Sequence, residues 1–246
     1  VRVLRVDNVQ TGEPRVVLVH FAAHPVVLGA ANRDFSPDYA GFAAAHIEQA
    51  LGSGVVAMFL QGGGGDTHPY ECGRSGSTGH QVTRATGASL GANALRVLQS
   101  MPPGPPAGPA SLQVMQTTLH FARRTNPAQV EPVGVMAVLI DNAIALGVIS
   151  GEPFVPLQLN LVGQSPVADT FFMGYSYYGL GIPLTTYLPT VQAVEEGGYG
   201  AATIAVLEPV AGERMIEQTS AMLRHLHDPE SPLEIAVPFT VSNLET

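Results

Sequence analysis

The sequence predicts an α/β fold in which a mixed sheet is flanked by helices. Apolar segments of strand length alternate with longer segments whose apolar residues have helical spacing. Glycine and proline separate these segments. The apolar fraction of 46% and the charged fraction of 13% are typical of a chain with a large buried core. With 246 residues, the chain is long enough for one sizeable core or two small ones.

The N-terminal part predicts a hairpin, a helix and a buried strand. A Gly/Pro turn at residues 11–14 separates two apolar strands. Ser36 is placed to cap a helix, with Pro37 at its first position and Asp38 in its first turn. The apolar stripe of this helix consists of Tyr39, Phe42, Ala43, Ile47 and Ala50. Strands are expected at residues 1–6, 15–22 and 55–60, and the helix is expected to end at Gly52.

The rest of the chain predicts further strands and helices on both sides of a proline-rich connector at residues 102–109. This connector is either a surface excursion or a subdomain boundary. A helix is expected to begin near Pro153, and an aromatic loop is expected at residues 175–187. The other expected elements are strands at 112–121, 133–140, 143–150 and 170–173, and helices at 78–99 and 211–227. The last helix is expected to bury Met215, Ile216, Thr219, Met222, Leu223 and Leu226.

Composition also excludes several classes of protein. The net charge of −9, from 20 acidic and 11 basic residues, repels phosphate backbones, so we expect no nucleic-acid partner. Cys72 is the only cysteine, which excludes an internal disulfide and a cysteine-rich metal module. No apolar run approaches the roughly 20 residues of a membrane-spanning helix. Residues 1–6 are typical of a strand rather than of a signal peptide, and we interpret the chain as a piece of a longer protein.

Three loops that follow strands contain residues capable of chemistry, and loops beyond strand ends form the sites of open α/β sheets. His24 is either a metal ligand or a buried histidine bonded to the backbone, whereas His20 is interpreted as a core residue. The glycines of the Gly62–His68 turn either let its backbone approach a ligand closely, or they form a tight turn that presents Asp66, Thr67 and His68. Asp66 could also simply cap that turn through its carboxylate. Glu152 is either a helix-dipole partner or a ligand. Together, these loops indicate a metal hydrolase more than any one of them does.

Other hydrolase classes lack their signatures here. The sequence contains no Gly-x-Ser-x-Gly nucleophile elbow, which argues against an α/β-hydrolase. It contains no His-Glu-x-x-His motif, which argues against that class of metalloprotease. Four segments instead resemble, in order, the neutral/alkaline ceramidase family. They are residues 20–25 with 32–33 and 36–41, residues 59–62 with 65–69, residues 151–154, and residues 187–190 with 195–199.

The resemblance implies a zinc-dependent amidohydrolase, which splits an N-acylsphingosine or related N-acyl lipid into a fatty acid and an amine. It implies that His24, Glu152 and Tyr187 bind Zn²⁺. It also implies that Tyr199, twelve residues after Tyr187, hydrogen-bonds the scissile carbonyl or its oxyanion and so contacts the substrate. The family's first zinc histidine, and an arginine that helps to hold the substrate, are expected upstream of Val1.

The turn at residues 65–69 resembles the family's Gly-Asp-x-Ser-Pro active-site turn. This implies that Gly65 and Thr67 contact the substrate and that Asp66 takes part in catalysis. His68 occupies the position of the family's serine, and it could relay a proton or orient water. The expected reaction is metal-assisted hydrolysis, in which water attacks the amide or ester carbon directly.

The resemblance further implies one N-terminally truncated catalytic domain over residues 1–246, with a role in sphingolipid metabolism. The implied partner is a small-molecule or lipid amide, and peripheral contact with membrane lipid is compatible with it. An extracellular or periplasmic location is inherited from the family. Two alternatives stay open at this point. One is a zinc esterase or amidase on a non-lipid acyl substrate, and the other is a ceramidase-like binding module whose site has decayed.

Overall fold

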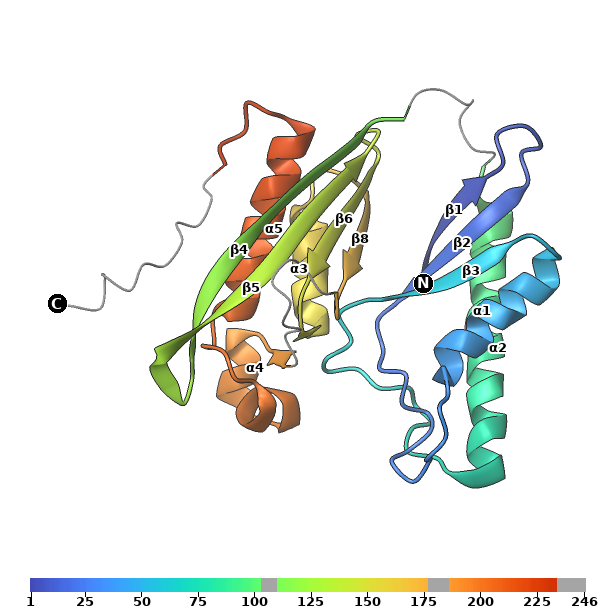
Figure 1. The fold of residues 1–246 in the computed structure, drawn as a ribbon, viewed down its shortest axis with the longest axis horizontal. Coiled ribbons are helices and arrows are strands. Elements are labelled where there is room, and N and C mark those ends of the chain that lie inside the picture. The colour runs from blue at the N-terminus through green and yellow to red at the C-terminus, as the bar shows by residue number, and fades with distance from the viewer. Residues whose placement is uncertain (103–109, 177–185, 234–246) are drawn as a thin grey trace. The chain divides into compact units, whose positions relative to one another are not determined.

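The computed structural model describes residues 1–102, 110–176 and 186–233, and it divides the chain into two compact units (Figure 1). The first unit comprises Val1–Gln61 and Thr67–Pro109, and the second comprises Gly62–Asp66 and Ala110–Thr246. The change of unit between Pro109 and Ala110 falls at the end of the proline-rich connector, of which residues 103–109 lie outside the described residues. Each unit contains its own mixed sheet, so the α/β class is confirmed, and the strands of the described residues are divided among three sheets.

The sheet of the first unit has the order β1-β2-β3. Its strands are β1 (Arg2–Asp7), β2 (Pro14–Phe21) and β3 (Val56–Gln61). β1 and β2 form the predicted antiparallel hairpin, whereas β3 is parallel to β2. β2 and β3 therefore end at the same edge of the sheet, with Phe21 opposite Gln61.

Two helices cover one face of this sheet, α1 (Asp38–Leu51) and α2 (Gly76–Ser100) (Figure 1). The helices approach closely because α2 has Gly87 at the contact, where a Cβ atom would overlap the Cβ of Phe42. Most of the predicted stripe of α1 is buried in the core between helices and sheet. This core contains Val17, Val19, Tyr39, Ala43, Ile47, Ala57, Leu90, Ala94 and Leu98.

The start of α1 differs from its prediction in one respect. The helix begins at Asp38, so Pro37 and not Ser36 occupies the N-cap position, and the Ser36 hydroxyl accepts the Asp38 N–H (3.1 Å) from one residue further out. Asp38 itself is only 5% exposed and has a left-handed backbone, with φ of 49°. Its carboxylate accepts the backbone N–H groups of Val27 (3.2 Å) and Leu28 (2.9 Å), so it fastens the loop after β2 to the helix.

The main sheet of the second unit has the order β4-β5-β6-β8. Its strands are β4 (Leu112–Arg123), β5 (Asn126–Ile140), β6 (Ile144–Ile149) and β8 (Asp169–Met173). The first three are antiparallel neighbours, and β8 is parallel to β6. β5 begins earlier than its apolar pattern predicts, because its polar first residues pair with β4 and Arg123 bonds Glu131 across the hairpin.

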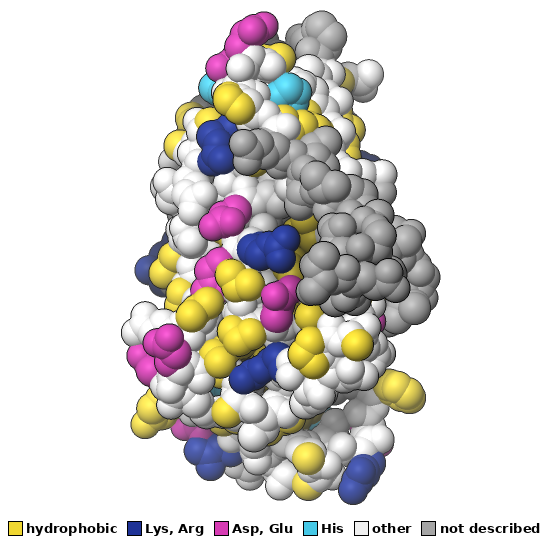
Figure 2. Space-filling view, turned by 90° about the vertical axis from the view of Figure 1, so that its left-hand side faces the viewer, with side chains coloured by type: hydrophobic (Ala, Val, Ile, Leu, Met, Phe, Trp, Pro, Cys, Tyr) yellow, Lys and Arg dark blue, Asp and Glu magenta, His cyan; other side chains and the backbone are white. Residues whose placement is uncertain are grey.

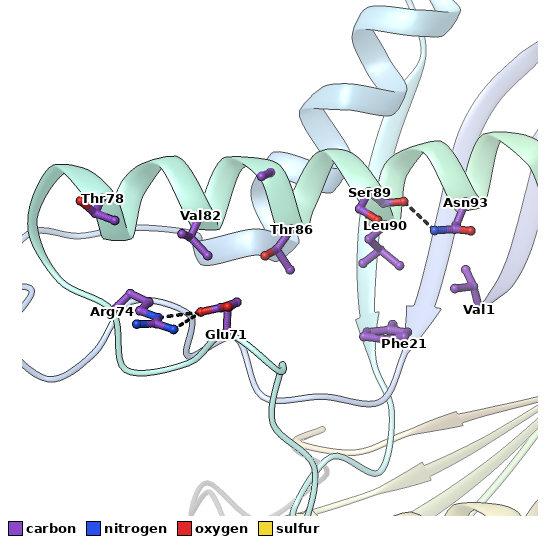
Figure 3. A pocket seen from close by; sticks show the side chains of 11 residues that line it. Val1, Phe21, Glu71, Arg74, Thr78, Val82, Thr86, Ser89, Leu90 and Asn93 are labelled. Atoms are coloured by element: carbon purple, nitrogen blue, oxygen red, sulfur yellow. Dashed lines mark hydrogen bonds and ion pairs between the residues drawn. The ribbon is translucent and has the colours of Figure 1, made fainter.

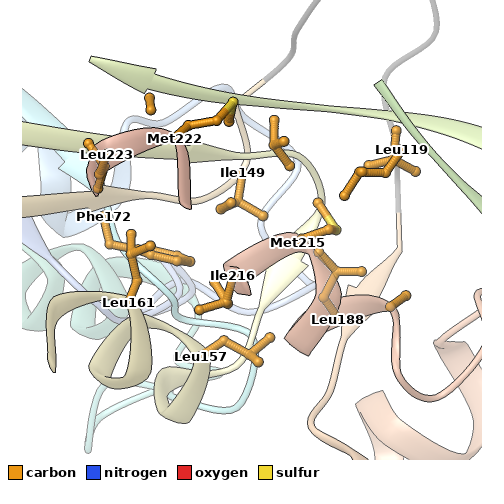
Figure 4. Packing of buried hydrophobic residues seen from close by; sticks show 14 of the residues in the cluster. Leu119, Ile149, Leu157, Leu161, Phe172, Leu188, Met215, Ile216, Met222 and Leu223 are labelled. Carbon is orange, nitrogen blue, oxygen red and sulfur yellow. The ribbon is translucent and has the colours of Figure 1, made fainter. Parts of the chain in front are cut away.

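The core of the second unit lies between this sheet and the helices α3 (Val155–Gln164) and α5 (Ala211–His227) (Figure 4). α5 has the predicted bounds, and its inward residues Met215, Ile216, Thr219, Met222 and Leu223 are buried. They pack with Leu157 and Leu161 of α3 and with residues of the sheet such as Leu119, Ile149 and Phe172. Leu226 is partly buried against the same core.

Short elements complete the second unit. They are β7 (Glu152–Pro153), β9 (Tyr187–Leu188), α4 (Val191–Glu196) and the π-helix η1 (Tyr199–Ile204). β7 and β9 form a separate two-stranded parallel sheet. Within the aromatic loop predicted at residues 175–187, Tyr177 and Tyr178 lie outside the described residues.

The surface mixes charges of both signs. Figure 2 shows acidic and basic side chains close to one another, among hydrophobic ones, on one face of the molecule. In the second unit, Arg123 pairs with Glu131 and Arg214 pairs with Glu208. Because such partly exposed pairs contribute little, the stability of this unit rests on its hydrophobic core. None of the helices among the described residues combines the length and the hydropathy that a membrane span requires.

Candidate functional site

His24 lies where β2 and β3 end side by side, as the strand-end argument predicts. The Gly62–His68 turn follows β3, and the Thr67 carbonyl accepts the backbone N–H of His24 (2.9 Å). The Nδ1 atom of the His24 ring lies 3.2 Å from the same carbonyl oxygen. The His68 ring stands edge-to-face to that of His24, with 5.1 Å between the ring centroids. The fold of the first unit therefore brings His24, Thr67 and His68 together.

The hydrogen bond of the His24 ring determines which of its nitrogens is basic. A carbonyl oxygen can only accept, so Nδ1 carries the proton in this bond, and in the neutral tautomer Nε2 carries the lone pair. This is the arrangement in which a histidine binds metal through Nε2 while a backbone carbonyl orients the ring. His24 is 9% exposed, so its ring is held by its surroundings, whereas the His68 side chain is exposed.

The first residues of α1 hold the loop that contains His24. The buried Tyr39 hydroxyl donates a hydrogen bond to the carbonyl of Ala23 (2.7 Å), the residue before His24. Burial, and secondarily the charge of Asp38, raises the pKa of Tyr39, so the phenol remains a donor. His20, which was interpreted as a core residue, is 4% exposed within β2.

Glu152 occupies the corresponding place in the second unit, beyond the end of β6. The parallel strand β8 ends beside β6, and Tyr175 follows it with its N–H bonded to the Gly151 carbonyl (2.8 Å). The Tyr175 hydroxyl donates a hydrogen bond to Oε2 of Glu152 (3.3 Å). Through the pairing of β7 with β9, Glu152 lies directly opposite Tyr187. The predicted ligands Glu152 and Tyr187 are therefore neighbours.

Tyr187 lies among aromatic rings and keeps its proton at neutral pH. Burial raises the pKa of Tyr187 to about 12, with further contributions from the charge of Glu152, from Tyr199 and from a hydrogen bond with Glu152. Its ring stands edge-to-face to those of Tyr199 (5.9 Å between centroids) and Phe154 (6.3 Å). Tyr199 is 72% exposed, so it is accessible to a substrate.

The glycine-rich part of the turn supports the Glu152 segment. The Gly65 N–H donates to the Pro153 carbonyl (2.9 Å), and a Cβ atom at Gly65 would overlap the carbonyl oxygen of Glu152. Oδ1 of Asp66 accepts the N–H of Val155 (2.7 Å), the first residue of α3. Asp66 thus caps the helix that follows Glu152, instead of its own turn.

The donor atoms of the predicted ligands suit zinc in their chemistry. Imidazole nitrogen and carboxylate oxygen are common zinc ligands, and a phenol becomes one by releasing its proton. His24 belongs to the first unit, and Glu152 and Tyr187 belong to the second. Within the described part of the chain, no three His, Cys, Asp or Glu side chains gather into a metal-binding group.

Tyr175 and Asp38 are site-building residues that sequence reasoning missed. Tyr175 was one of several aromatic residues in a loop, and nothing in the sequence distinguishes it. Its left-handed backbone, with φ of 56°, and its bond to Glu152 appear only in the structure. Asp38 was interpreted as a first-turn residue, and its role in fastening the His24 loop depends on contacts distant in sequence.

Comparison with solved structures defines the class of fold, which is that of the neutral ceramidases. The structure of neutral ceramidase from Pseudomonas aeruginosa matches with a TM-score of 0.69 and 15% identity, over 98% of this chain and 48% of that one. A ceramidase complexed with C2 matches with a TM-score of 0.72 and 15% identity, over 96% and 49%. The chain therefore spans about half the length of these structures. No protein-family model and no curated protein sequence matches it.

Proposed function

We propose that this chain belongs to a zinc-dependent hydrolase that splits the amide bond of an N-acylsphingosine or a related N-acyl lipid. The observation that carries the proposal is the pairing of Glu152 with Tyr187, with Tyr199 packed against Tyr187. These residues resemble the zinc and substrate segments of ceramidases in sequence. The similarity of the fold to ceramidase structures supports the same reaction class.

In this proposal, His24, Glu152 and Tyr187 bind one zinc ion. His24 would bind through Nε2, because its Nδ1 proton is engaged by the Thr67 carbonyl. Glu152 would bind through its carboxylate, which Tyr175 orients. Tyr187 would exchange its proton for the ion, since a nearby cation lowers a phenol pKa. When bound, zinc would supply Lewis-acid chemistry, which polarises a carbonyl and acidifies water.

The protein's own side chains provide the remaining steps. The exposed Tyr199 hydroxyl would donate a hydrogen bond to the oxyanion that forms when water attacks the amide carbon. His68, edge-to-face with His24, would accept a proton from the attacking water and return it to the amine that leaves. Asp66 would keep the turn in place through its bond to Val155 rather than touch the substrate.

Zinc binding and hydrolysis of a substrate panel test the proposal. Zinc affinity is measured by competition with a chromogenic chelator, and hydrolysis is measured with long-chain N-acyl amides, short-chain amides and acyl esters. Glu152→Gln is expected to weaken zinc binding by more than about tenfold, since even residues that only orient ligands change affinity by that factor. Glu195→Gln, on the exposed surface of α4, serves as the control and should leave zinc affinity unchanged.

Each outcome selects one hypothesis. Preferential hydrolysis of long-chain amides supports the proposal, and hydrolysis confined to esters or short-chain substrates supports the alternative acyl hydrolase. A protein that binds no zinc and hydrolyses nothing in the panel is the decayed binding module, and this result would overturn the proposal.

A further inference from the structure

An open groove runs along one side of α2 in the first unit (Figure 3). Its volume is about 720 Å³, which lies within the range of about 300–1,000 Å³ of small-molecule sites. Phe21, at the end of β2, and the loop containing Glu71 and Arg74 lie across from the helix. Val1 also lines the groove, and the lining residues of α2 are Thr78, Val82, Ala85, Thr86, Ser89, Leu90 and Asn93.

The lining combines an apolar surface with neutral polar groups at both ends. Phe21, Val82 and Leu90 supply apolar contacts along the groove. At the far end, the Asn93 side chain donates a hydrogen bond to the Ser89 carbonyl (2.8 Å). At the end near the start of α2, Nε of Arg74 donates a hydrogen bond to Oε2 of Glu71 (2.7 Å), and the two side chains form an ion pair. Because the pair is neutral as a whole, it favours hydrogen bonds with an uncharged polar group over the binding of an ion.

The length of the groove fits a lipid chain. Thr78 and Asn93 are fifteen residues apart on α2, which corresponds to about 22 Å at the helical rise of about 1.5 Å per residue. A lipid chain spans half of the roughly 30 Å hydrocarbon core of a bilayer, or about 15 Å. One chain therefore fits along the lining with room for a polar head.

We infer that this groove binds one unbranched hydrocarbon chain of an amphiphilic ligand, with an uncharged amide or hydroxyl head beside Glu71 and Arg74. A hydrocarbon chain makes no hydrogen bonds, which suits a wall formed by a helix whose backbone groups are already paired. An extended peptide would need partners for its own N–H and C=O groups along the whole groove. A charged head would meet a pair whose net charge is zero, so it would gain little from electrostatic attraction.

The groove adjoins the part of the first unit that contains His24. Phe21 precedes His24 by three residues, and Glu71 follows His68 by three. The loops are joined by the bond from the Arg74 N–H to the Val27 carbonyl (2.8 Å). The inference rests on the proposed function, because it assigns to the groove the recognition of a chain of the N-acyl lipid.

Calorimetric titration with ethanolamides of butanoic, octanoic and dodecanoic acid tests the inference, with a chelator present so that zinc chemistry plays no part. Affinity is expected to rise by about two- to fourfold for each methylene from the butanoyl to the octanoyl compound. Octanoate, with its charged head, should bind more weakly than octanoyl ethanolamide. Equal affinities for the butanoyl and octanoyl compounds, or tighter binding of octanoate, would overturn the inference.

Substitutions on α2 locate the bound chain. Thr86→Trp fills the groove and is expected to weaken octanoyl binding by about tenfold or more, because the added ring occupies the same volume. Ser89→Trp, at an exposed lining position, tests the same point if Thr86→Trp unfolds the helix. Gln81→Trp, exposed on the same helix but outside the groove, is the matched control. Wild-type affinity in a folded Ser89→Trp variant would contradict the assignment.

The two proposals fail in different ways. Chain-length-dependent binding without hydrolysis leaves the groove in place and contradicts the proposed function. Hydrolysis that persists with unchanged KM in the Trp variants, together with absent binding in the titration, contradicts the groove alone.

Discussion

Replacing Gly65 tests whether the turn supports Glu152 as the structure indicates. A Cβ atom at this position would overlap the carbonyl oxygen of Glu152 and would lie 2.9 Å from Cδ1 of Phe154. One of these obstacles is backbone, so the turn must shift, and the bond from the Gly65 N–H to the Pro153 carbonyl (2.9 Å) is lost or weakened. Gly65→Ala therefore combines overpacking with a lost buried hydrogen bond.

The expected magnitude follows from these contributions. Overpacking of a tight site costs about 1–3 kcal/mol and an unmade hydrogen bond costs about 1 kcal/mol, so the free energy of unfolding should fall by about 2–4 kcal/mol. Gly163→Ala is a matched control in the same unit, because it is expected to raise the free energy of unfolding instead of lowering it. Among the described residues, no atom lies within 4 Å of the added methyl group in α3, so this variant should be more stable by about 0.5–1 kcal/mol.

Urea denaturation followed by circular dichroism measures both variants against the wild type. Zinc affinity, measured by chelator competition, should fall in Gly65→Ala, because the shift moves the backbone of the proposed ligand Glu152. The reasoning would be refuted if Gly65→Ala unfolded within about 0.5 kcal/mol of the wild type, the range of an ordinary surface substitution.

Three further predictions concern single contacts. Asp66→Ala removes the cap on Val155 and should lower the free energy of unfolding by about 1 kcal/mol; an unchanged denaturation midpoint would contradict the capping role. Tyr39→Phe removes the hydrogen bond to Ala23 and should cost about 1–2 kcal/mol in the same assay, whereas no loss would show that this bond does not hold the loop. The raised pKa of Tyr187 means that the unfolded chain releases this proton first, so stability should fall between pH 10 and about 12 in metal-free protein. Denaturation curves across this interval should show a smaller fall for Tyr187→Phe, and an equal fall would contradict the assignment.

The sequence predicts best those elements whose stability comes from a regular apolar face. α5 has the predicted bounds because its buried residues recur at helical spacing along its whole length. The first residues of β5 were not predicted to belong to a strand, because many of them are polar. Pairing with β4, rather than burial, holds them in the sheet. The division of the strands among separate sheets was also missed, since the pairing of strands is not encoded in their individual apolar patterns.

The candidate site was predictable to the extent that it follows strand ends. His24 and Glu152 follow the ends of strands that have a parallel neighbour. The order of predicted strands and loops along the sequence is sufficient to predict such positions. The supporting contacts from Tyr175 and Asp38 occur at residues with left-handed backbone conformations, which are uncommon outside glycine. Such positions are determined by the surrounding tertiary structure, so no local sequence signal could have identified them.

The Thr67 carbonyl accepts hydrogen bonds from both the backbone N–H and the ring Nδ1–H of His24. The conformation of the turn therefore influences which ring nitrogen of His24 carries the proton. If the peptide plane between Thr67 and His68 rotated, the imidazole would be released to move its proton from one nitrogen to the other. A change in the turn could then abolish the proposed zinc binding while every proposed ligand side chain remained intact. Inactive relatives of such a protein would retain an apparently complete set of ligands.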